Sequence, residues 1–126
     1  MELVTPPLDG MILPGVTRDS VLALAREHIT GKKPLAHLPD NLIVSERLVT
    51  MEEVVEASKS GRLVELFGAG TAATISPVDK IGYLGEDLLI PTGHDGMGTV
   101  SRPIWTELVG RQTGAIASEW SVSVAD

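Results

Sequence analysis

Three stretches of the chain place apolar residues at helical spacing between polar ones, and they predict three helices. The first begins near Thr17, which we expect to be its N-cap. The second runs over about residues 51–61, behind a capping box formed by Thr50 and Glu53. The third covers about residues 99–114. Each of these stretches begins or ends at a recognisable helix terminus, which sets it apart from the intervening chain.

Short apolar runs bounded by glycine and proline predict strands between these helices. Residues 2–5 and 11–13 flank the pair Asp9-Gly10, so we expect them to form a hairpin. Further short strands or extended segments are expected within 42–49, 62–70, 71–91 and 119–124. This alternation of short strands with about three helices indicates a mixed α/β fold, with residues 1–126 as a single domain.

Composition narrows the functional classes. The chain has no cysteine, which excludes disulfides and thiolate metal sites. Its formal net charge of -7, without a lysine and arginine cluster, disfavours a nucleic-acid partner. No apolar run approaches the roughly 20 residues of a membrane-spanning helix, and no signal peptide is visible. The histidines His28, His37 and His94 are scattered, with no carboxylate at ligand spacing, so no metal site is expected.

Two glycine-containing segments could carry chemistry. "LPGVTRD" at 13–19 leads into the first helix, and "GAGTAA" at 68–73 offers amides beside the hydroxyl of Thr71. Glycine in such places usually serves only a turn or a cap. A helix start, however, also presents unpaired N–H groups that bind phosphate or carboxylate. Arg18 leaves a similar choice, since it could reach an anion or pair with a surface carboxylate.

The segments "ELVTPPLDGMILPGVTRDS", "LFGAGTAATISPV" and the terminal "EWS" together resemble the C-terminal part of branched-chain amino acid aminotransferases. These are pyridoxal 5′-phosphate enzymes of the fold-type IV class, which also contains the D-amino acid aminotransferases. The resemblance covers almost the whole chain and weakens in the loop "GKKPLAHLPDN". It implies transfer of an amino group between leucine, isoleucine or valine and 2-oxoglutarate. A homodimer is implied for the full-length enzyme.

The same resemblance implies which residues bind the cofactor: Leu13, Gly15, Val16, Thr17, Gly70 and Thr71. Leu13 would pack beside the pyridine ring, and the amides of Val16 and Thr17 would hold the phosphate. Thr71 would add its hydroxyl and amide to the same phosphate. The turn through Thr71 and Ala72 would offer amides to the substrate α-carboxylate.

The departures from the family pattern are equally specific. The Schiff-base lysine of the family lies upstream of the motifs seen here, as does the small N-terminal domain, so no catalytic residue is expected in this chain. The four lysines present are interpreted as solvated charges: Lys32, Lys33, Lys59 and Lys80. We therefore expect part of a longer enzyme, cytoplasmic or mitochondrial. The alternative is a stand-alone, non-catalytic domain that binds an anion or another subunit.

Overall fold

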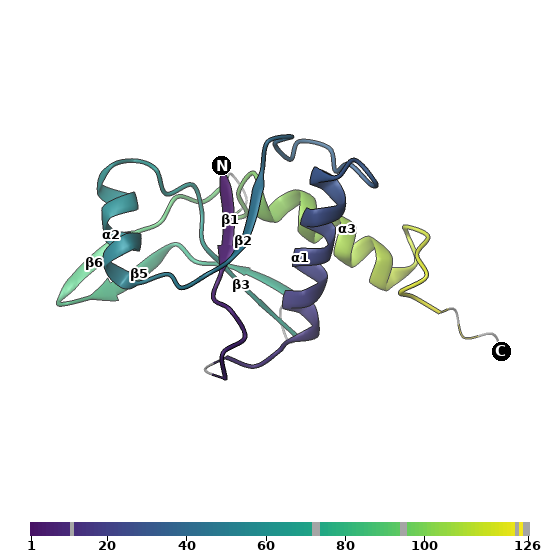
Figure 1. Ribbon diagram of the computed structural model, residues 1–126, viewed down its shortest axis with the longest axis horizontal. Helices are drawn as coiled ribbons and strands as arrows, with labels where there is room; N and C mark the ends of the chain where they lie inside the picture. The colour runs from purple at the N-terminus through teal and green to yellow at the C-terminus, as the bar shows by residue number, and fades with distance from the viewer. Residues whose placement is uncertain (11, 72–73, 94–95, 123, 125–126) are drawn as a thin grey trace.

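The computed structural model describes residues 1–10, 12–71, 74–93, 96–122 and 124. Within them three helices and six short strands alternate along the chain (Figure 1). The helices are α1 (Val16–Ile29), α2 (Met51–Lys59) and α3 (Ser101–Thr113). The strands are β1 (Glu2–Thr5), β2 (Ile43–Glu46), β3 (Phe67–Gly70), β4 (Thr74–Pro77), β5 (Lys80–Tyr83) and β6 (Glu86–Leu89). The expected mixed α/β class is confirmed.

The strands form three separate pairs. β1 and β2 are parallel, with Leu3 opposite Val44. The other two pairs, β3 with β4 and β5 with β6, are antiparallel hairpins. An isolated pair of parallel strands is unusual, because parallel sheets are normally wider and covered on both faces. Among the described residues, no further strand joins either outer edge of the β1–β2 pair.

The hairpin expected between residues 2–5 and 11–13 is wrong. The carbonyl of Thr5 accepts the N–H of Arg47 at 3.0 Å, so β1 pairs across the chain with β2 rather than with its neighbour. Ile12 and Leu13 lie outside any strand, and Met11 falls outside the described residues. Pro6 and Pro7 fix the backbone φ in the connection between the two segments, which restricts the tight turn that a hairpin would need.

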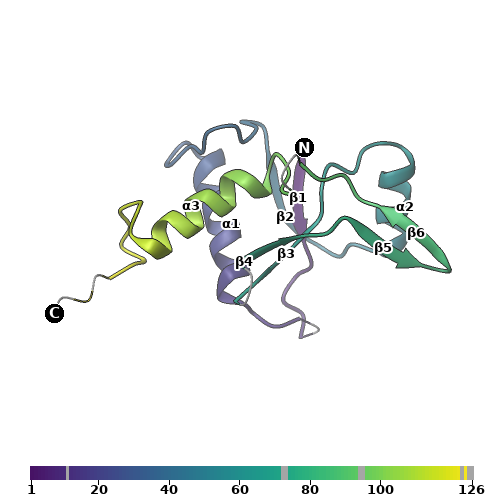
Figure 2. The same ribbon diagram turned by 180° about the vertical axis from the view of Figure 1, so that it is seen from behind.

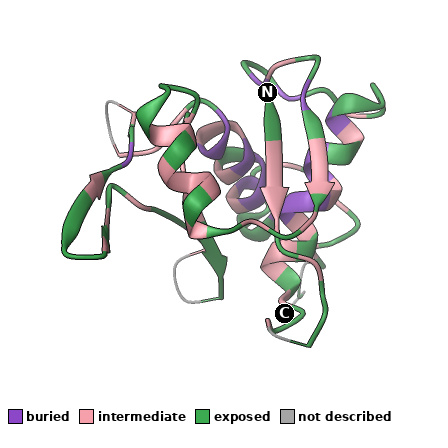
Figure 3. Ribbon diagram, turned by 60° about the vertical axis from the view of Figure 1, so that its left-hand side comes forward, coloured by how far each residue is buried: buried purple, intermediate pink, exposed green. Residues whose placement is uncertain are grey.

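The core lies where α1 and α3 pack against each other and against the strands. α1 contacts β2 and β3, and α3 contacts β4 (Figures 1 and 2). The buried residues share apolar side chains and gather around these two helices (Figure 3): Val21, Leu24, Ala25, Leu35, Leu38, Leu42, Ile75, Val100, Ile104 and Leu108. α2 has no buried residue and lies against the β5–β6 hairpin, away from this core. The packing between α1, α3 and the β3–β4 hairpin thus fixes the segments that carry the candidate site.

The helix ends follow the sequence expectations in part. The N-cap of α1 is Gly15 rather than Thr17, because the extended backbone at Gly15 starts the helix two residues earlier than expected. For α2 the hydroxyl of Thr50 accepts the N–H of Glu53 at 3.2 Å, as predicted. The Glu53 side chain instead pairs with Arg47, so only half of the capping box forms.

Candidate phosphate-binding site

The start of α1 presents uncapped amides. Gly15 has no side chain to accept a hydrogen bond, and the first helical bond runs from Asp19 N–H to the Gly15 carbonyl at 3.1 Å. The geometry of an α-helix leaves the N–H groups of Val16, Thr17 and Arg18 without an intrahelical acceptor. Val16 is 82% exposed. The helix start is therefore accessible to an anion, and the helix dipole favours negative charge there.

Leu13 stands just before this helix start and is 84% exposed. Its carbonyl accepts the N–H of Gly15 at 2.8 Å, which closes a tight turn ahead of the helix. This bond occupies the Gly15 amide, so the amides open to a ligand begin at Val16. A leucine so exposed presents an apolar surface that a planar ligand ring could cover.

Arg18 pairs with a carboxylate. Its Nη2 donates to Glu46 Oε1 at 2.7 Å and to the Pro6 carbonyl at 2.8 Å. Arg26 Nη2 donates to the other oxygen of Glu46 at 3.0 Å. The hydrogen bond from Arg18, followed by that from Arg26, lowers the pKa of Glu46 below its usual range. The two alternatives for Arg18 are thus resolved in favour of the carboxylate.

The second predicted segment forms the β3–β4 hairpin. Gly70 pairs with Thr74, and Thr71 follows β3 in a turn where both Gly70 and Thr71 are exposed. The glycines expected to form a turn therefore lie in a strand, and the turn begins one residue later. Ala72, predicted to contact the substrate carboxylate, lies outside the described residues. Thr71 itself lies on the surface of the chain, where a ligand could reach it.

The two donor segments belong to elements that touch. α1 contacts β3, and β3 runs toward the level of the first turn of α1 in both views (Figures 1 and 2). The packing thus brings together two elements that are far apart in the sequence, α1 ending at Ile29 and β3 beginning at Phe67. Convergence of the amides of Val16 and Thr17 and the Thr71 hydroxyl on one phosphate stays a prediction.

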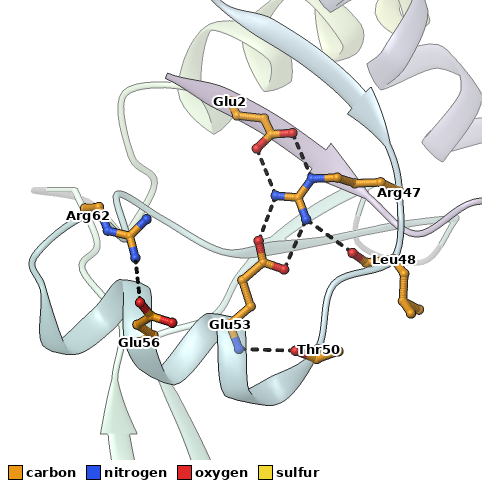
Figure 4. Close-up of polar contacts among 7 residues, drawn as sticks. All are labelled: Glu2, Arg47, Leu48, Thr50, Glu53, Glu56 and Arg62. Carbon is orange, nitrogen blue, oxygen red and sulfur yellow. Dashed lines mark hydrogen bonds and ion pairs between the residues drawn. The ribbon is translucent and has the colours of Figure 1, made fainter.

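A charge cluster around Arg47 ties β1 to α2 (Figure 4). Its guanidinium donates to both carboxylate oxygens of Glu2, at 2.9 and 3.1 Å, and to Glu53 at 3.0 Å. Hydrogen bonding to Arg47 is the main cause that lowers the pKa of Glu2 to about 2. It also lowers the pKa of Glu53. The sequence gives no local signal for this cluster, because Arg47 and Glu2 stand 45 positions apart.

The remaining candidates have structural roles. His28 is buried: its Nδ1 accepts the Leu35 N–H at 2.8 Å, which leaves Nε2 to donate to the Pro39 carbonyl at 3.0 Å. Trp105 is partly buried and packs against the core. Among the described residues no group of three or more potential metal ligands occurs, and His94 falls outside them. No helix in the described part of the chain has the length and apolar character needed to cross a membrane.

Comparison with known proteins decides the family. The chain is 46% identical to a branched-chain-amino-acid aminotransferase of Monosiga brevicollis over 124 residues, which is 98% of the chain and 29% of that protein. The chain corresponds to one region of a branched-chain-amino-acid aminotransferase. This agrees with the resemblance carried by the three motifs. No protein-family model matches the chain.

Other relatives give the same result. The cytosolic branched-chain-amino-acid aminotransferase of Saccharomyces cerevisiae is 46% identical over 94% of the chain and 25% of its own length. The cytosolic enzyme of Mus musculus is 42% identical over 98% of the chain and 29% of its own length. Mitochondrial forms are also among the relatives. The chain thus spans between 22% and 30% of the length of these curated relatives.

Proposed function

We propose that residues 1–126 are a single domain, the C-terminal part of a pyridoxal-phosphate-dependent branched-chain aminotransferase of fold-type IV. In this proposal the domain contributes part of the cofactor phosphate site. The observation that carries it is the start of α1, where glycine is the N-cap and no side chain occupies the first amides. A capped helix start would have closed this site to an external anion.

The donor set fits a phosphate group. Backbone amides at a helix start donate to oxygen and do not bring a mobile charge with them. Val16 and Thr17 supply two such amides, and Thr71 supplies a hydroxyl from the adjacent hairpin. Several donors from fixed backbone suit a dianion, which needs many hydrogen bonds at once. The exposed side chain of Leu13 gives the cofactor ring an apolar contact beside these donors.

When bound, pyridoxal phosphate supplies the electron sink that allows an amino group to be exchanged between an amino acid and a 2-oxo acid. The residues of this chain orient the cofactor through its phosphate, and the Thr71–Ala72 turn binds the α-carboxylate of the substrate. The substrates proposed are leucine, isoleucine or valine with 2-oxoglutarate. The full-length enzyme is proposed to be a homodimer in the cytosol or the mitochondrion.

The test compares Thr71→Val with Thr106→Val in the 126-residue chain. Thr71→Val removes one donor to the phosphate and keeps the side-chain shape, so it should weaken pyridoxal phosphate binding by about 1.5 to 3 kcal/mol. Thr106 is exposed in the middle of α3, and its replacement should leave binding unchanged. Dissociation constants come from equilibrium dialysis.

Two results would count against this function. Equal dissociation constants of the two variants for pyridoxal phosphate would show that Thr71 does not contribute to the site. Equal affinity of the wild-type chain for inorganic phosphate and for pyridoxal phosphate would favour the alternative of a non-catalytic anion-binding domain, because the ring would then contribute nothing.

A further inference from the structure

We propose that Arg18 and Glu46 are positioning residues, whose ion pair, together with the Pro6 carbonyl, holds the first turn of α1 in its phosphate-binding geometry. This inference rests on the proposed function. It concerns a contact between three segments: the turn after β1, the end of β2 and the start of α1. We call the Arg18 guanidinium, the Glu46 carboxylate and the Pro6 carbonyl together the Arg18 clamp.

The geometry of the Arg18 clamp is specific. One guanidinium nitrogen of Arg18 donates to Pro6 at 2.8 Å and to Glu46 at 2.7 Å. The Arg18 side chain is only 12% exposed, and that of Glu46 is 34% exposed. A guanidinium so far removed from solvent needs fixed acceptors, because an unpaired charge in that position would be costly. The clamp therefore ties the 6–14 loop to α1 at the point where the helix begins.

The position of Arg18 in the first turn of α1 also supports a role for its ion pair with Glu46. A basic residue in the first turn of a helix is unfavourable, because the helix dipole places positive charge there. Glu46 offsets this charge from outside the helix. Arg18 follows directly after Val16 and Thr17, so the side chain that anchors the turn is one residue from the amides it would align.

The Arg18 clamp also explains why two sequence motifs occur together. Pro6 belongs to "TPPLDG" and Arg18 to "LPGVTRDS", and the hydrogen bond between them is a direct contact between the motifs. The intervening loop carries Leu13 and Gly15, which the proposed site uses. Fixing both ends of the loop limits where these residues can lie.

A positioning role and a purely electrostatic role predict opposite effects of Glu46→Gln. Removing the negative charge of Glu46 makes the surroundings of the helix start more positive, so electrostatics alone would tighten phosphate binding. Loss of the charged acceptor also loosens the first turn of α1, so a positioning role predicts weaker binding. Arg26→Gln is the matched control. Arg26 also pairs with Glu46, but its side chain is 48% exposed, and its substitution leaves the bond between Arg18 and Glu46 in place.

The experiment titrates the 15N-labelled 126-residue chain and its variants with inorganic phosphate and with pyridoxal phosphate. The amide shifts of Val16 and Thr17 report binding, and order parameters over residues 12–18 report the rigidity of the turn. We expect Glu46→Gln to weaken binding of both ligands by roughly fivefold and to lower these order parameters. Arg26→Gln should stay within about twofold of wild type, since its ion pair is largely solvent-exposed.

Unchanged or tighter binding by Glu46→Gln, with unchanged order parameters, would overturn the proposal. If the amides of α3 show that Glu46→Gln is unfolded, Arg18→Lys decides instead: it keeps the charge but loses the planar group, and it should weaken binding as well. If the wild-type amides of Val16 and Thr17 do not respond to either ligand, the proposed function fails. The order parameters then still decide whether the Arg18 clamp holds the turn.

Discussion

Glu65 replaces a local cap at the start of α3, and its removal should destabilise the fold. Its Oε1 accepts the N–H groups of Val100 at 2.6 Å and Ser101 at 2.9 Å. Its Oε2 accepts the Gly98 N–H at 3.1 Å and the Ser101 hydroxyl at 2.7 Å. One carboxylate thus satisfies three backbone donors and a hydroxyl at the helix start, and it holds the segment before β3 against α3.

The magnitude for Glu65→Ala follows from these contacts. Val100 and Ser101 are 4% and 0% exposed, so water cannot readily replace the lost acceptor. A buried donor left unsatisfied costs about 1 to 3 kcal/mol. The Gly98 N–H keeps a second acceptor in the Ser101 hydroxyl at 3.0 Å. Since neighbouring losses are not additive, we expect a loss of about 3 kcal/mol in the free energy of unfolding.

The assay is urea unfolding followed by circular dichroism, with the thermal midpoint as a second measure. A loss of about 3 kcal/mol should lower the melting temperature by roughly 12 °C for a chain of this size. Glu56→Ala is the control: its side chain is 79% exposed and lies 3.8 Å from Arg62, so its loss should cost less than about 0.5 kcal/mol. Equal unfolding midpoints for the two variants would refute the reasoning.

Three further predictions concern acid stability, activity and association. The pKa of Glu2 is lowered to about 2 from 4.5, so its stabilising contribution is complete above about pH 4.5 and disappears as the pH falls toward 2. The unfolding free energies of wild type and Glu2→Gln should thus differ by less than about 1 kcal/mol at pH 7 and converge near pH 2; a constant difference would contradict this. The 126-residue chain with pyridoxal phosphate should form glutamate from leucine and 2-oxoglutarate no faster than free cofactor, because none of its lysines stands in the sequence context of the family's Schiff-base lysine; faster formation would overturn this. Exposed Leu13, Val16 and Leu89, together with the outer edges of β1–β2, which no further described strand joins, should make the chain associate in sedimentation experiments, and a monodisperse monomer would contradict that expectation.

The helices were predictable because their signals are local. Thr50 caps α2 with its own hydroxyl, and Gly114 ends α3 with a left-handed backbone at φ 81°. The start of α1 was misplaced by two residues, since Thr17 is a strong capping residue but the extended conformation of Gly15 starts the helix first. Local chemistry thus located each helix and left its boundaries uncertain by about two residues: α2 begins at Met51 as predicted but ends at Lys59, and α3 covers Ser101–Thr113.

The long-range contacts were not predictable from one sequence. Glu65 caps a helix 35 positions away, and β1 pairs with β2 rather than with the chain that follows it. The residues that flank Glu65 and β1 in the sequence give no indication of these distant partners. The candidate site could be proposed from the sequence because glycine and threonine stand close together in each segment, whereas the Arg18 clamp depends on Glu46 in a different element.

The central claim is that the start of α1 and the turn after β3 bind one phosphate group. The most direct measurement compares pyridoxal phosphate, pyridoxal and inorganic phosphate as ligands of the 15N-labelled chain. We expect saturable shifts of the Val16, Thr17 and Thr71 amides with the two phosphate-bearing ligands and none with pyridoxal. Shifts of the same size with pyridoxal, or phosphate-dependent shifts confined to other residues, would contradict it.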